Sequence, residues 1–122
     1  PENETELKQI AEEICPEGVY DLSDASIELD RPDVEPFIRQ IPSIFEAGLT
    51  EIWIQRIMDD VRDLEVGEDN RHTFYAMREG KRILLVTEVQ RIKKDGFVVL
   101  FWAPESVAAA IGAKMEDFCA DT

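Results

Sequence analysis

The sequence has little of the side-chain chemistry on which most enzymes depend. Its 122 residues include one histidine, His72, and two cysteines, Cys15 and Cys119. Histidine is the usual proton-transfer residue near neutral pH, but His72 belongs to no nucleophile elbow, phosphate-binding loop or paired Cys-x-x-Cys motif. We therefore predict no catalytic residue, no metal site and no cofactor, and favour a non-enzymatic role.

Two cysteines are also too few for a disulfide framework. An acidic chain with so few cysteines is typical of a reducing compartment, so we expect a cytoplasmic protein with free thiols. A bridge between Cys15 and Cys119 stays open as an alternative, which would require their Cα atoms to lie within about 7 Å.

Long apolar runs are absent as well. No run approaches the roughly 20 residues of a membrane-spanning helix, and the first six residues, PENETE, lack the basic and then apolar order of a signal peptide. Hydrophobic residues make up 44% of the chain and charged residues 33%, a composition that argues against disorder and against a membrane protein. The length fits a single domain, residues 1–122.

Basic residues are scarce, and the excess of acid is unevenly placed. The chain has 27 acidic and 13 basic side chains, for a net charge of −14. Residues 1–70 hold 20 acidic and 5 basic side chains, whereas residues 71–122 hold 7 and 8. Such a surface repels nucleic-acid phosphates and anionic lipids and attracts basic proteins. The alternative is that the charge serves only to keep the protein soluble.

What the sequence does contain is a cluster of predicted strands between residues 71 and 104. Residues 72–78, 82–92 and 97–102 are rich in β-branched and aromatic residues. Gly80 marks the first turn, and Asp95-Gly96 is typical of a two-residue type I′ hairpin. That turn would fix which residues share a face of the sheet. One face would carry Phe74, Ala76, Ile83, Leu85, Val89, Val98, Leu100 and Trp102, and the other Tyr75, Met77, Leu84, Val86, Ile92, Phe97, Val99 and Phe101.

Both predicted faces are apolar, so we expect helices to cover much of both. Apolar residues recur at helical spacing in residues 3–15, after Pro36 with a break at Pro42, after the capping residue Thr50, and after Pro104. Residues 19–29 are either a short hairpin around Ser23–Ser26 or a solvated acidic loop. The predicted fold is α+β, with N-terminal helices, an antiparallel meander of three to five strands, and a C-terminal helix packed on the sheet.

The strand-to-helix step at Phe101, Trp102, Pro104 and Glu105 resembles that of small bacterial α+β domains of the SseB type, a resemblance that implies no function. In size, acidity and predicted fold the chain is also similar to many immunity proteins, which neutralise toxins.

The leading functional prediction is a non-enzymatic interaction protein, such as an immunity protein, an inhibitor or a chaperone-like adaptor, acting as a monomer or homodimer. Its partner would be a basic protein, for example a toxin or an effector, with no nucleic acid and no membrane involved. One alternative is a small-molecule-binding domain or minor enzyme with a pocket at Tyr75, Glu88, Gln90 and Phe101, where two polar residues interrupt an apolar face. Another is a nucleic-acid mimic presenting Asp59, Asp60 and Asp63. The residues predicted to contact the basic partner are Asp21, Asp24, Glu28, Asp30, Asp59, Asp60 and Asp63.

Overall fold

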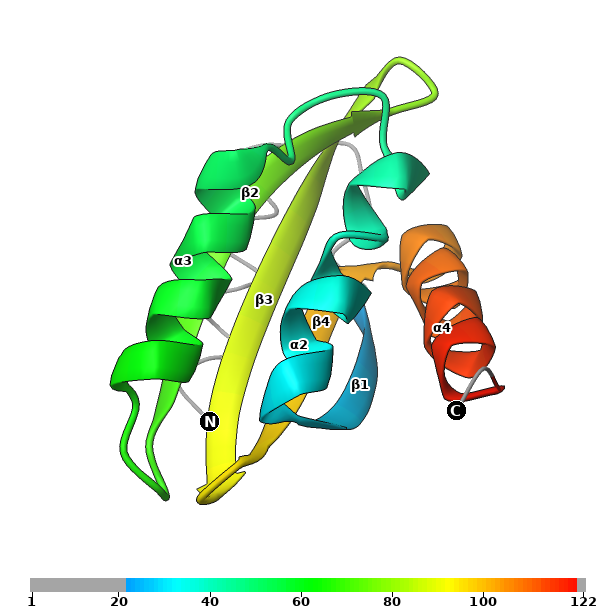
Figure 1. The fold of residues 1–122 in the computed structure, drawn as a ribbon. Helices are drawn as coiled ribbons and strands as arrows, with labels where there is room; N and C mark the ends of the chain where they lie inside the picture. Colours follow the sequence, from blue (N-terminus) through cyan, green and yellow to red (C-terminus); the bar gives the residue numbers. More distant parts are fainter. Residues whose placement is uncertain (1–21, 121–122) are drawn as a thin grey trace.

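The computed structural model describes residues 22–120, which form a four-stranded antiparallel sheet with helices packed on one face (Figure 1). The predicted α+β class, with a C-terminal helix on the sheet, is confirmed. The strands lie in the order β1-β4-β3-β2. In chain order the elements are β1 (Leu22–Asp30), α2 (Arg31–Ile38), the 3-10 helix η1 (Ile41–Ile44), α3 (Glu51–Asp63), β2 (Asp69–Arg78), β3 (Lys81–Lys93), β4 (Gly96–Pro104) and α4 (Glu105–Ala120).

The stretch predicted as a hairpin or a loop is instead one continuous strand, β1. Its nine residues pair with β4 in unbroken register, from Leu22 opposite Pro104 to Asp30 opposite Gly96. Ser23–Ser26 contain neither glycine nor proline, so nothing forces the chain to turn there. Ile27 and Leu29 point to the helices and are buried, and Glu28 between them points to the opposite face.

The turn between β3 and β4 differs from its prediction by one residue. Lys93 pairs with Gly96 and Arg91 pairs with Phe97, so Ile92 is an extra residue in β3 and the loop is Lys94-Asp95. A bulge of this kind places two residues opposite one. Because side chains alternate along a strand, a shift of one residue turns every side chain of β4 to the other face.

The predicted assignment of faces is therefore wrong for β4 and correct for the β2–β3 hairpin. Phe97, Val99 and Phe101 point to the helices together with Leu85 and Val89. The opposite face carries Leu84, Val86, Tyr75, Met77, Val98, Leu100 and Trp102. Within residues 22–120 no helix lies on this second face, so the expectation of helices on both faces is confirmed for one only.

The structure confirms the predicted start of α3 and places the start of α2 earlier than predicted. α3 starts after Thr50, whose hydroxyl accepts a hydrogen bond from the Ile52 backbone N–H at 3.2 Å, as predicted. α2 starts at Arg31, five residues before the predicted start at Pro36, which lies inside it. The predicted break near Pro42 is confirmed, because α2 ends at Ile38 and η1 follows.

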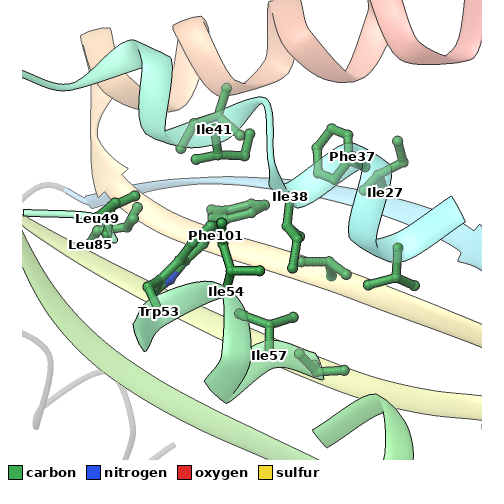
Figure 2. Packing of buried hydrophobic residues seen from close by; sticks show 14 of the residues in the cluster. Ile27, Phe37, Ile38, Ile41, Leu49, Trp53, Ile54, Ile57, Leu85 and Phe101 are labelled. Atoms are coloured by element: carbon green, nitrogen blue, oxygen red, sulfur yellow. The ribbon is translucent and has the colours of Figure 1, made fainter. Parts of the chain in front are cut away.

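The core lies between the helices and the sheet. Figure 2 shows Phe101 at its centre, with Trp53 of α3 and Phe37 of α2 close by. The ring centroids of Phe37 and Trp53 each lie 6.4 Å from that of Phe101. The Trp53 indole N–H donates to the Thr87 hydroxyl at 3.3 Å, which gives both buried polar groups a partner. None of the described helices is long and apolar enough to cross a membrane.

Candidate functional site

Strand β1 carries a line of exposed carboxylates along one side of the sheet, which we call the acidic edge: Asp24, Glu28 and Asp30. All three side chains point away from the helices, because Ile27 and Leu29 point toward them. Glu28 is the one member with a basic neighbour among residues 22–120, Lys93, at 4.0 Å. Both of those side chains are more than 60% exposed, so solvent screens the pair strongly.

The arginine that follows the acidic edge does not neutralise it. Arg31 directs its Nε to Asp95 Oδ1 at 3.2 Å and its Nη1 to the Val61 carbonyl at 2.8 Å. Asp30 occupies the N-cap position of α2, but its side chain makes no capping hydrogen bond there. The carboxylates of the acidic edge are therefore available to a partner.

A hollow of about 290 Å³ lies at the end of the acidic edge. It is lined by Glu28, Leu29, Asp30, Asp33, Phe118 and Cys119. Phe118 is held in place by an edge-on contact with Phe37, whose ring centroid lies 5.5 Å away. Apolar surface beside carboxylates suits the long side chain of lysine or arginine, which packs its stem on apolar groups and keeps its charged head near water.

Four of the six residues that line this hollow were not predicted as site residues: Leu29, Asp33, Phe118 and Cys119. Asp33 stands in the acidic stretch that precedes Pro36, and Phe118 ends the apolar stripe of α4. Only the packing of α4 beside β1 and α2 brings Asp33 and Phe118 together.

The acids of α3 do not extend this surface. Asp59 and Asp63 share Arg62, whose Nη1 lies 3.3 Å from Asp59 and whose Nε lies 2.8 Å from Asp63. The hydrogen bond from Arg62 lowers the pKa of Asp63. α3 packs over β3, whereas β1 is at the far edge of the sheet and its acids point to the other face. The predicted partner-binding acids thus form two separate groups.

Asp60 belongs to neither group, because it is buried with 7% of its surface exposed. Its Oδ1 accepts a hydrogen bond from the Asn70 amide at 2.9 Å, and its Oδ2 lies 2.5 Å from His72 Nε2. Asn70 and His72 are on β2, so these contacts attach α3 to the sheet. The prediction that Asp60 faces a partner is wrong, and so is the arrangement of Asp59, Asp60 and Asp63 as one acidic surface for the nucleic-acid mimic.

The four residues predicted to line a ligand pocket do not share a face. Phe101 is fully buried in the core on the helical side. Glu88 and Gln90 lie on the second face, where Arg71 donates to Glu88 at 2.8 Å and Gln90 donates to Glu88 at 2.5 Å. Tyr75 is also on this face, where it is exposed and the Arg82 guanidinium lies 4.5 Å from the centroid of its ring.

Glu88 is buried, and its partner is the residue directly opposite it on the neighbouring strand. Arg71 and Glu88 are cross-strand partners, and the Arg71 guanidinium also lies 5.1 Å above the Trp102 ring. A buried charge needs such a partner. Glu88 and Gln90 thus satisfy each other and Arg71 without a ligand.

Two predicted residues, Asp21 and Cys15, lie outside the described range, as does the helix predicted for residues 3–15. Cys119 is exposed in α4. In the part of the chain that the structure describes, no three histidine, cysteine or acidic side chains converge as a metal site requires. No family model, no curated protein and no solved structure matches this chain.

Proposed function

We propose that this is a non-enzymatic interaction protein that binds a basic partner protein through the acidic edge and the adjoining hollow. An immunity protein, an inhibitor or a chaperone-like adaptor would act in this way. The observation that carries the proposal is the exposure of Asp24, Glu28 and Asp30 along one strand, with no arginine paired to them among residues 22–120.

The electrostatics of the chain support the same role. A net charge of −14 attracts a basic protein over a distance and speeds encounter. Salt screens that attraction, because the Debye length falls to about 8 Å at physiological ionic strength. Binding should therefore weaken as salt rises, and association should slow more than dissociation quickens.

Two variants with the same change in charge test the proposal. The first, Asp24→Asn with Glu28→Gln and Asp30→Asn, neutralises the acidic edge. The second, Asp59→Asn with Asp63→Asn and Glu65→Gln, removes three charges elsewhere on the surface and serves as the control. Each is immobilised beside the unchanged protein and exposed to lysate of the native organism at low and high salt, and captured proteins are identified by mass spectrometry.

We expect the unchanged protein and the control to capture the same basic protein at low salt, and the acidic-edge variant to lose it. Equal capture by all three proteins would contradict the proposal, because the acidic edge would then have no role. Capture of an acidic partner, or of none at either salt concentration, would contradict it as well.

A further inference from the structure

Strand β1 is an edge strand whose outer side has no partner within residues 22–120. It pairs with β4 on its inner side at all nine positions, with no bulge and no proline. The other edge of the sheet is partly closed, because the Glu46 N–H donates to the Met77 carbonyl at 2.7 Å and the Met77 N–H donates to the Ala47 carbonyl at 2.9 Å. An edge strand presents backbone N–H and C=O groups that can pair with another strand.

We propose that β1 takes up an extended basic segment of the partner protein as a fifth strand of the sheet. This inference rests on the proposed function and names how its partner binds. Addition of a strand obtains affinity from main-chain hydrogen bonds and specificity from the side chains on each face.

Charge decides which strand can be added. Residues two apart on a strand point to the same face about 6.6 Å apart, so Glu28 and Asp30 are neighbours there and Asp24 continues the same line. In an added strand, lysine or arginine at every second position would lie beside these carboxylates. Opposite charges on neighbouring strands stabilise a sheet, and like charges destabilise it.

The same rule excludes a second copy of the chain as the occupant. Two β1 strands paired about a two-fold axis would place the carboxylates of both copies on the same face, directly opposite or diagonal to one another. The acidic edge therefore prevents self-association through β1 and admits a basic strand.

The hollow defines the other face of the added strand. Leu29 points toward the helical side, and Phe118 of α4 lines the hollow beside it. An added strand would direct its alternate residues to this side, and the one that reaches the hollow would lie near Asp33 and Phe118, which suit a long basic side chain that packs its stem on the ring. β-branched residues suit the other positions on this face, because they favour the extended backbone of a strand.

A synthetic peptide probes this mode of binding. The peptide acetyl-Lys-Val-Lys-Thr-Lys-Val-Lys-Thr-Lys-amide, labelled with fluorescein, has nine residues, the same length as β1. Two further versions carry N-methyl groups, one on the lysines and one on the valines and threonines. Successive N–H groups of an extended strand point to opposite edges, so each version blocks a different edge of the peptide.

Binding is measured by fluorescence polarisation at low salt, and the site by chemical-shift and hydrogen-exchange changes of the β1 amides. We expect one methylated peptide to bind at least about ten-fold more weakly than the unmodified peptide and the other to bind within about two-fold of it. The reason is that N-methyl groups remove main-chain hydrogen bonds to β1 only when they lie on the edge of the peptide that pairs with it. Exchange of outward-pointing amides in β1 should slow on binding.

Three outcomes would overturn the inference: equal binding by both methylated peptides, no measurable binding of the unmodified peptide, or chemical-shift changes confined to residues outside β1. The acidic-edge variant separates this failure from failure of the proposed function. If both methylated peptides bind equally but that variant binds all of them weakly, strand addition is wrong and the acidic edge remains a charged docking surface. If the variant and the control variant bind alike, the acidic edge has no role and both proposals fail.

Discussion

The buried contact between Asp60 and His72 makes a sharp prediction for stability. Asp60 has a side chain that is 9% exposed and lies 2.5 Å from the His72 ring, with the Asn70 amide on its other oxygen. Removal of one partner of a buried hydrogen bond leaves the other group unsatisfied, which costs about 1–3 kcal/mol. Asp60→Asn keeps the shape of the side chain and one hydrogen bond, so we expect a loss of about 2 kcal/mol.

The control for this change is the preceding residue. Asp59 is on the same helix, but its side chain is 44% exposed and is held by Arg62 and Gln55 at the surface. We expect Asp59→Asn to change the free energy of unfolding by less than about 0.5 kcal/mol. For a domain of this size, the Asp60 variant should melt roughly 6–12 °C lower than the unchanged protein.

Urea unfolding followed by circular dichroism measures both variants, and a double-mutant cycle with His72→Phe measures the contact itself. We expect the two substitutions to be non-additive by at least about 0.5 kcal/mol, because their side chains touch. If Asp60→Asn proves no more destabilising than Asp59→Asn, or if the cycle is additive, then Asp60 does not attach α3 to β2.

Two more predictions concern the core and the surface. Phe101→Ala should lower the free energy of unfolding by about 3–5 kcal/mol, because Phe101 is fully buried between Phe37 and Trp53. If Phe101→Ala lowered the urea midpoint less than Leu100→Ala, a change at a half-buried residue, its place in the core would be contradicted. Glu51→Gln tests an exposed pair, since a hydrogen bond from Arg39 lowers the pKa of Glu51. A carboxyl with a lowered pKa stabilises the fold above its unfolded-state pKa and loses that contribution as the pH falls through its folded-state pKa. The variant should therefore be slightly less stable at neutral pH and equal to the unchanged protein in strong acid, and a difference that grows on acidification would refute this assignment.

The structure changes what the acidity of the chain implies. From the sequence, the negative charge of the first 70 residues reads as one property of that half. Among residues 22–70 the acids have different surroundings: the acidic edge has little basic compensation, Asp59 and Asp63 on α3 share Arg62, and the buried Asp60 is bound to β2. Of these three groups the acidic edge is the most open to a partner, which is why the proposals concern β1.

Local patterns alone determined much of the fold. Runs of β-branched and aromatic residues identified the three strands of the meander, because their side chains suit a pleated surface whatever lies around it. Thr50 identified the start of α3, since a capping hydrogen bond involves only residues in the next turn. The helical spacing of apolar residues after Pro104 likewise predicted α4.

Tertiary structure decided which residues meet. The bulge at Ile92 places Phe101 in the core and not in the predicted pocket. The Asp95-Gly96 dipeptide does not predict this bulge, because the register of β4 depends on which of its faces packs under the helices. The same packing buried Asp60 and made β1 an edge strand with its carboxylates outward. Contacts between residues far apart in the chain depend on the whole fold, and the candidate interaction surface consists of such contacts.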